Sequence, residues 1–258
     1  MWKQLKKMFK GLMIAIQVDW IDTLRLNLFH LPLRQGYKLP ILLFKASLHI
    51  MQGAKVYLNV KEDECCFGMI KLGYQYSKNV ISSVGIQIDL RSGNLIFTGS
   101  GIIGRGSNII TRKGGSIILG SNFRISGNIS LCSFQKIKIG NKFSCSWNVS
   151  IYDTDFHETI DLDTSKELPM TKEVIIGNNC WLCQKSTVLK GVLLPDWSVV
   201  GACALVNKNY KDCLSHTLFA GVPAKPLKKR IVRTDLKTIA NNETWKVTSG
   251  LHLLNPLS

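Results

Sequence analysis

An aliphatic residue that returns every six positions constrains this sequence more than any other feature. From residue 176 it occupies six successive places: Ile176, Leu182, Val188, Leu194, Val200 and Val206. Compact residues follow four places after the first five: Cys180, Ser186, Val192, Ser198 and Ala204. Neither the 3.6-residue period of a helix nor the two-residue period of a strand produces this pattern. A period of six is typical of a parallel β-helix, in which each hexad forms one short side of a coil.

The six-residue period continues upstream, with one slip of two residues. It recurs at Leu119, Ile125 and Leu131, and again at Ile139, Cys145 and Ile151. We expect the first residue of each hexad to point into the shaft and the compact fifth residue to pack inside it. Three hexads would close one triangular coil, so that residues 18 apart stack, as with Ile176 and Leu194. Glycine follows the aliphatic position at five expected corners: Gly104, Gly120, Gly140, Gly177 and Gly201.

The repeat predicts how the chain is divided. We expect an all-β protein whose left-handed β-helix domain covers residues 85–211. The repeat breaks over 152–175, a polar and acidic stretch that we expect to leave the shaft as a loop. Residues 1–60 are predicted to form a helical extension, and 212–258 to form a basic segment with a cofactor-binding turn and a tail.

Apolar residues at helical spacing predict a basic amphipathic helix within residues 2–16. They are Trp2, Leu5, Phe9, Leu12 and Ile16, with Lys3, Lys6, Lys7 and Lys10 between them. Such a helix either docks on the body of the protein or lies on an anionic membrane surface. On the second interpretation, residues 1–18 would contact the inner face of a membrane.

Composition excludes several classes of protein. The chain carries 33 Lys and Arg against 17 Asp and Glu, a net charge of +16, and 45% hydrophobic residues exclude a disordered chain. No apolar run reaches the roughly 18 to 20 residues of a membrane span, and no secretion signal is recognisable. We expect a cytoplasmic protein. The charge is spread along the chain without a nucleic-acid motif, so we expect no nucleic-acid partner.

The eight cysteines fit a reduced compartment. Cys180 and Cys183 form a CxxC pair, but no second pair with zinc spacing accompanies them. The repeat accounts for both positions, and we expect no metal.

Two further motifs accompany the hexads, DTDFH at 153–157 and AGVPAKPLKKR at 220–230. Together with IGNNCWLCQKSTVLKGV at 176–192, they resemble the hexapeptide-repeat acyltransferases, and among these the sugar O-acetyltransferases that include maltose and galactoside acetyltransferase. DTDFH is similar to the loop of members that decorate bacterial polysaccharides. The resemblance covers about residues 95–230. It implies a left-handed β-helix, a homotrimer, a carbohydrate acceptor and acetyl-CoA as the acyl donor.

His157 is the expected general base. Acyl transfer to a hydroxyl needs a group that removes the proton as oxygen attacks, and imidazole titrates near neutral pH. The resemblance places the catalytic histidine of the family in a corresponding excursion. Asp153 and Asp155 are expected to orient the imidazole. A metal site and a capped turn are the alternative interpretations of the two aspartates.

The resemblance also assigns binding residues. Asn128 and Trp181 are expected to contact the acceptor, although a stacked corner asparagine and interface packing explain them equally well. The expected cofactor-binding residues are Gln184, Ala202, Asn207, Lys208, Gly221, Pro223, Ala224, Lys225 and Lys228. The lysines would meet the phosphates of CoA, with charge but without the planar fork of arginine.

The sequence thus predicts an acetyl-CoA-dependent O-acetyltransferase that acts on a sugar hydroxyl in bacterial surface polysaccharide, such as capsule, O-antigen or exopolysaccharide. Direct attack within a ternary complex is the expected mechanism. The alternative is a basic β-helix scaffold, or a nucleic-acid-binding or membrane-binding protein, without catalysis.

Overall fold

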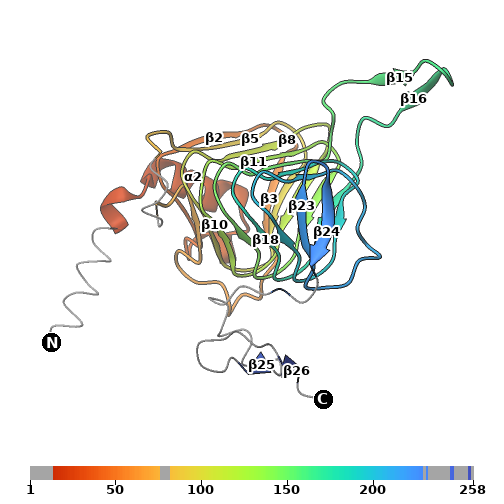
Figure 1. Cartoon of the computed structure of the whole chain (residues 1–258). Helices are drawn as coiled ribbons and strands as arrows, with labels where there is room; N and C mark the ends of the chain where they lie inside the picture. Colours follow the sequence, from red (N-terminus) through yellow and green to blue (C-terminus); the bar gives the residue numbers. More distant parts are fainter. Residues whose placement is uncertain (1–13, 76–81, 229–230, 232–244, 247–254, 257–258) are drawn as a thin grey trace.

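The computed structural model describes residues 14–75, 82–228, 231, 245–246 and 255–256 of the 258-residue chain. Three parallel sheets form the sides of a shaft that fills most of the view in Figure 1. The chain passes from the first sheet to the second and the third and then returns to the first, so each coil adds one strand to each sheet. We call these sheets A, B and C.

Each sheet is built from strands that lie far apart in the sequence. Sheet A contains β1 (Ile41–Leu43), β4 (Ile70–Leu72), β7 (Gly101–Ile103), β10 (Phe123–Ile125), β13 (Ser144–Cys145), β18 (Trp181–Leu182), β21 (Val199–Val200), β23 (Leu218–Gly221) and β24 (Ala224–Lys228). Sheet B contains β2 (Ala46–Ile50), β5 (Ile86–Leu90), β8 (Asn108–Thr111), β11 (Ser130–Ser133), β14 (Ser150–Tyr152), β19 (Thr187–Val188) and β22 (Leu205–Val206). Sheet C contains β3 (Lys55–Leu58), β6 (Asn94–Phe97), β9 (Ser116–Leu119), β12 (Lys136–Ile139), β17 (Val174–Ile176) and β20 (Leu193–Leu194).

The predicted fold class is confirmed, and the hexad register with it. Ile176 pairs with Leu194, and Leu182 pairs with Val200, as the 18-residue coil requires. The aliphatic position of every hexad is buried, and so is the compact fifth position. The fifth-position residues Cys180, Ser186, Val192, Ser198 and Ala204 are each at most 1% exposed. A larger side chain at these places would meet the coils above and below.

The corners between sheets combine a closely stacked glycine with a residue in the left-handed backbone conformation. Gly120 and Gly140 stack so closely that a Cβ on Gly120 would lie 2.4 Å from the carbonyl carbon of Gly140. These glycines therefore allow close approach of successive coils, and neither has a positive φ. The left-handed backbone falls two residues later, at Asn122 (φ 58°), Lys142 (φ 56°) and Asn179 (φ 57°). Asparagine tolerates this conformation better than most residues.

The shaft begins much earlier than the sequence predicted. β1 pairs with β4 from Ile41 to Leu43, and β2 pairs with β5 from Ala46 to Ile50. This corrects the predicted boundaries, because the coils start inside the segment 1–60 and well before residue 85. The first coils have longer strands and longer connections than the later ones, so they lack the strict spacing of six. Most of the predicted amphipathic helix 2–16 lies outside the described residues.

Helix α2 (Trp20–His30) covers the N-terminal end of the shaft, followed by the short helix α3 (Leu33–Gly36). Two buried polar side chains of α2 bond to β1, the edge strand of sheet A. Thr23 Oγ1 accepts from the Leu43 amide at 3.0 Å, and Asn27 Oδ1 accepts from the Ile41 amide at 3.1 Å. The helix thereby satisfies backbone groups that an open edge would offer to another chain.

The predicted excursion 152–175 leaves the shaft between β14 and β17. It contains an antiparallel hairpin of β15 (Thr159–Asp161) and β16 (Lys166–Leu168), which projects from the shaft in Figure 1. At the C-terminal end, β23 and β24 form an antiparallel hairpin, and β25 (Trp245–Lys246) pairs with β26 (Asn255–Pro256). Among the described residues, no helix has the length and apolarity needed to cross a membrane.

Candidate functional site

His157 lies at the base of the excursion and is exposed. The preceding residue, Phe156, makes edge-on ring contacts with Phe134 and Tyr152, at centroid distances of 5.8 and 5.4 Å. The Phe156 amide also donates to Thr154 Oγ1 at 2.9 Å. The aromatic cluster of Phe134, Tyr152 and Phe156 therefore fixes the backbone immediately before the imidazole, while the imidazole itself faces solvent.

Asp153 does not contact the imidazole, which corrects its predicted orienting role. The residue is fully buried, and its Oδ1 accepts from the Phe134 amide at 2.7 Å. Its Oδ2 accepts from the Gln135 amide at 3.0 Å and from Ser133 Oγ at 2.7 Å. The carboxylate thus holds the corner on which the aromatic cluster rests.

Asp155 ties the excursion to the shaft. Its carboxylate forms an ion pair with Lys190, and its amide donates to the Met170 carbonyl at 3.0 Å. Lys190 also donates from Nζ to the Pro169 carbonyl at 2.6 Å. These contacts join the two ends of the excursion and attach both to the coil beside them, so Asp155 fixes the base of the loop that carries His157.

A second group of predicted site residues lies at the corner between sheets A and B, which we call the AB corner. Asn128, Gln184 and Ala202 follow the sheet A strands of three different coils. Asn128 has φ 49°, and its backbone N–H donates to the Arg105 carbonyl at 2.8 Å. Gln184 accepts at its carbonyl from the Cys203 amide at 3.0 Å, whereas Ala202 is exposed. Asn128 therefore occupies a stacked corner, which was the alternative interpretation of this residue.

The closing turn extends the AB corner. It joins β23 to β24, and β23 pairs with β21 next to Ala202. Gly221 and Pro223 are exposed, whereas Ala224 is buried and accepts at its carbonyl from Tyr210 Oη at 2.7 Å. Lys225 is exposed on β24, and Lys228 is the last residue of that strand. The predicted turn residues thus stand together at one end of the corner.

The remaining predicted residues lie elsewhere. Trp181 is partly exposed on β18, where it pairs with Ser144 and Val199 along sheet A. Asn207 and Lys208 are exposed and follow β22, at the corner between sheets B and C, which we call the BC corner. His157 leaves the shaft at this same BC corner. The structure therefore divides the predicted site between two corners.

The two corners lie on opposite long edges of sheet B. Asn128 precedes β11 and Phe134 follows it, so the strand separates the acceptor and cofactor residues of the AB corner from the aromatic cluster. With about 3.3 Å per residue, six residues along an extended strand span roughly 20 Å. One chain alone does not bring the imidazole to the AB corner.

Three cysteines of the repeat, Cys132, Cys145 and Cys180, are part of the core. Cys180 is fully buried, and burial raises its pKa to about 12. Burial also raises the pKa of Cys132 to about 11, with a smaller contribution from the Asp153 carboxylate. Both thiols therefore stay protonated at neutral pH, which makes them poor nucleophiles. Within the described residues, no three metal-binding side chains gather.

Sequence reasoning missed Phe134, Tyr152 and Lys190. The two aromatic residues flank the DTDFH motif in space, but Phe134 belongs to the preceding coil, and only the coil register shows which corner it shares. One feature of the sequence could have indicated these aromatic partners. Phe156, inside the motif, is an aromatic residue that needs apolar neighbours at the base of the loop.

Known proteins with similar sequences include several acetyltransferases. No protein-family model matches the chain. It is 27% identical over 139 residues to a polysialic acid O-acetyltransferase of Escherichia coli O1:K1, which covers 53% of the chain and 44% of that protein. It is 28% identical over 116 residues to the galactoside O-acetyltransferase of Escherichia coli K12, which covers 45% and 55%. A chloramphenicol acetyltransferase of Morganella morganii is 29% identical over 87 residues, which covers 32% and 40%.

The predicted resemblance to the sugar O-acetyltransferases is confirmed. The chain spans about half the length of these curated relatives. Among solved structures, a polysialic acid-specific acetyltransferase aligns with 81% of the chain and 92% of its own length, with a TM-score of 0.47 and 21% identity.

Proposed function

We propose that this protein transfers an acetyl group from acetyl-CoA to a sugar hydroxyl of a bacterial surface polysaccharide, with His157 as the general base. The observation that carries the proposal is an exposed imidazole on a firmly anchored loop. O-acetyltransferases that act on polysialic acid and on galactosides are among the relatives of the chain, which supports the acceptor class.

The proposed reaction needs no acyl-enzyme. The imidazole of His157 takes the hydroxyl proton as the sugar oxygen attacks the thioester carbonyl. Backbone or side-chain donors stabilise the oxyanion of the tetrahedral intermediate. The intermediate then collapses with loss of the CoA thiolate, which takes up the proton from the imidazolium. The buried thiols of Cys132 and Cys180, whose pKa values burial raises, are unsuited to form an acyl-enzyme.

The AB corner offers suitable groups for acetyl-CoA, which supplies the activated acetyl group. Ala202 and Gln184 bring backbone groups to an accessible edge, which suits the amide-bearing pantetheine arm. The exposed Lys225 provides a cation of the kind that the CoA phosphates need. Asn207 and Lys208 stand at the BC corner, so in a trimer they would approach the CoA from the copy that contributes His157. Lys228, at the end of the same strand as Lys225, is proposed to act with them.

We propose a homotrimer, and the division of the site supports it. Because His157 and the AB corner lie on opposite edges of sheet B, a complete site requires the AB corner of one copy beside the BC corner of the next. Three copies around one axis satisfy this requirement for every chain. We propose that the monomer is inactive for this reason.

Localisation is part of the same proposal. We infer a cytoplasmic enzyme whose basic residues 1–18 hold it near lipid-linked glycans at the inner membrane face. Deletion of 1–18 should move the protein from the membrane fraction to the supernatant without loss of turnover on a free acceptor. Unchanged fractionation would contradict the membrane role of this segment.

Acetyl-CoA turnover tests the central proposal. Free-thiol release should depend on the acceptor in the wild type and should fall by at least about 100-fold in His157→Ala, because a general base contributes roughly 10² to 10⁴. Glu158→Gln, at an exposed neighbour in the same loop, is the matched control and should retain turnover. Equal turnover by His157→Ala would favour the scaffold alternative.

A second acceptor class follows from one relative. The chloramphenicol acetyltransferase of Morganella morganii acts, by its name, on a hydroxylated antibiotic. Chloramphenicol therefore belongs in the acceptor panel beside monosaccharides and extracted bacterial glycans. Turnover with chloramphenicol alone would replace the polysaccharide with a small hydroxylated acceptor while leaving the role of His157 intact.

A further inference from the structure

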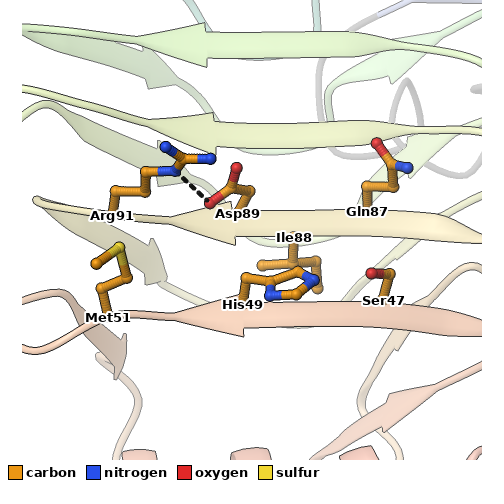
Figure 2. A pocket seen from close by; sticks show the side chains of 7 residues that line it. All are labelled: Ser47, His49, Met51, Gln87, Ile88, Asp89 and Arg91. Atoms are coloured by element: carbon orange, nitrogen blue, oxygen red, sulfur yellow. Dashed lines mark ion pairs between the residues drawn. The ribbon is translucent and has the colours of Figure 1, made fainter.

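A hollow lies on the outer face of sheet B, near the N-terminal end of the shaft. It has a volume of about 500 Å³, within the usual range for small-ligand sites. Two neighbouring strands line it, as Figure 2 shows, with side chains in two parallel rows. The row along and just beyond β2 contains Ser47, His49 and Met51, and the row along and just beyond β5 contains Gln87, Asp89 and Arg91.

The chemistry of this hollow matches a sugar ring. The strand register pairs Ser47 with Gln87 and His49 with Asp89, so a hydroxyl, an amide and an imidazole share one surface. These groups both donate and accept hydrogen bonds, as a ring with several hydroxyls requires. Met51 adds an exposed apolar side chain at one end, suited to the C–H face of a ring.

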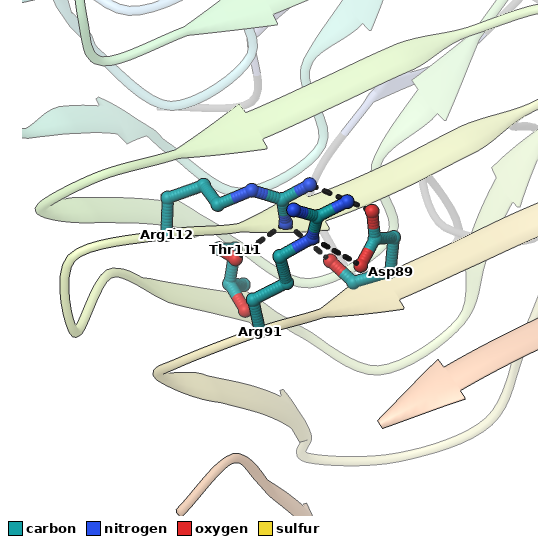
Figure 3. Close-up of polar contacts among 4 residues, drawn as sticks. All are labelled: Asp89, Arg91, Thr111 and Arg112. Atoms are coloured by element: carbon teal, nitrogen blue, oxygen red, sulfur yellow. Dashed lines mark hydrogen bonds and ion pairs between the residues drawn. The ribbon is translucent and has the colours of Figure 1, made fainter. Parts of the chain in front are cut away.

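Among the charged side chains that line the hollow, Arg91 is accessible to a ligand. Arg112 holds the Asp89 side chain with a contact of 2.6 Å from Nη2 to Oδ2 and donates from Nη1 to the Asp89 and Thr111 carbonyls at 3.0 and 2.9 Å (Figure 3). Arg91 reaches Asp89 Oδ1 only through Nε, at 3.5 Å. Its side chain is 61% exposed, against 24% for Arg112.

Two guanidinium groups therefore surround one carboxylate, and the surplus positive charge lies on the accessible Arg91. The terminal nitrogens of an arginine form a planar fork that fits a carboxylate. A ligand with both hydroxyls and a carboxylate matches this hollow better than a neutral sugar does.

The position of the hollow connects it with His157. Arg91 lies at the BC corner, the long edge from which the His157 loop departs. In sheet B, β5 is followed by β8, β11 and β14, and the excursion begins after β14. Three strand spacings of about 4.8 Å place the hollow roughly 14 Å from the coil that carries the imidazole. A polymer lying across the strands spans this distance, and a single sugar does not.

We propose that the hollow binds an acidic sugar unit of a polymeric acceptor while another unit of the same polymer reacts at His157. This inference rests on the proposed function for its acceptor class. Such a second site would make the enzyme specific for long acidic chains. The hollow contributes to acceptor binding only when one acceptor molecule reaches both the hollow and His157.

Binding without acetyl-CoA tests the hollow by itself. Calorimetric titration would compare a sialic acid chain of about ten units, the single sialic acid and a neutral maltose oligomer of equal length. The wild type should bind the acidic chain at least about tenfold more tightly than either comparison ligand. Arg91→Ala should remove most of this advantage, and His49→Ala combined with Gln87→Ala should reduce it. Arg124→Ala, at an exposed arginine on sheet A, is the matched control and should change nothing.

The outcomes separate this inference from the proposed function. If Arg91→Ala binds the acidic chain as tightly as the wild type does, the hollow is not the second site. If the wild type shows no preference for the acidic chain over the neutral chain, the assignment of an acidic unit is wrong. Failure of the proposed function appears differently, as acidic-chain binding that depends on Arg91 but without acceptor-dependent thiol release.

Discussion

At the scale of single residues, Phe156 determines where His157 lies. Its ring contacts Phe134 and Tyr152 and is still 45% exposed, so it contributes more to the loop base than to the core. Phe156→Ala should lower kcat about tenfold or more, because a displaced base loses its alignment with the hydroxyl. The KM for acetyl-CoA should stay within about twofold, since the proposed donor site lies at the AB corner.

A steady-state kinetic measurement checks this, with Phe156→Tyr as the control that keeps the ring. The pH dependence of kcat/KM should be the same in Phe156→Ala as in the wild type, because the base is unchanged and only its position differs. A variant with unaltered kcat would show that the aromatic cluster does not position the imidazole.

The two aspartates of DTDFH show the limit of residue-level prediction. Their types and spacing suit an orienting role toward His157, yet Asp153 bonds to residues 133–135 and Asp155 pairs with Lys190. Both partners belong to other coils, and no local spacing in the motif identifies them. The motif located the loop correctly, whereas the coil register decided what each carboxylate contacts.

At the scale of elements, the corners carry strain that substitution can relieve. Lys142 has φ 56° at a corner where the neighbouring coils place Asn122 and Asn179. A left-handed backbone costs most L-residues about 1 to 2 kcal/mol, and asparagine less. Lys142→Asn should therefore raise the free energy of unfolding by about 0.5 to 1 kcal/mol and the Tm by about 2 °C.

Thermal and urea unfolding would measure this change, and Asn122→Lys is the reciprocal variant, expected to lower stability by a similar amount. A lower Tm for Lys142→Asn would mean that the lysine makes compensating contacts at this corner. Activity should be unaffected, because this corner lies between sheets C and A, away from both parts of the candidate site.

The hexads predicted the later coils well because there each side is one hexad long. Ile176, Leu182 and Val188 fall on the three sheets in turn, and each pairs with the residue 18 places later. In the first coils the strands lengthen and the connections vary, so Ile41 pairs with Ile70 and Ile86 with Ala46 at irregular intervals. Inward-facing aliphatic residues are still present, but without a constant period they do not reveal a coil.

At the scale of the whole molecule, the division of the site between two corners was not accessible from the sequence. The sequence motifs assign Asn128, Gln184 and His157 to one site, because the linear sequence does not show at which corner of the shaft each residue lies. The fold places the strands of sheet B between them, and in the proposed trimer a second copy supplies what one chain lacks. The whole assembly, rather than the chain, is therefore the proposed catalytic unit.

The buried thiols of the shaft predict how global stability responds to alkaline pH. Burial raises the pKa of Cys132 to about 11 and that of Cys180 to about 12, from the ordinary value of 9.0. Between pH 9 and these values, the unfolded chain loses protons that the folded chain keeps. The contribution of the thiols is thus complete below pH 9, and above it each thiol lowers the free energy of unfolding by roughly 1.4 kcal/mol per pH unit.

Urea unfolding in reducing buffer, at about pH 7.5, 9 and 10.5, would measure this loss. Lysines and tyrosines also titrate in this range, so the decisive quantity is the difference between the wild type and Cys180→Ala. Alanine already occupies the equivalent buried position as Ala204, which makes the substitution compatible with the coil. The variant should lose stability less steeply than the wild type above pH 9, and parallel curves would show that the Cys180 thiol titrates alike in the folded and unfolded chains.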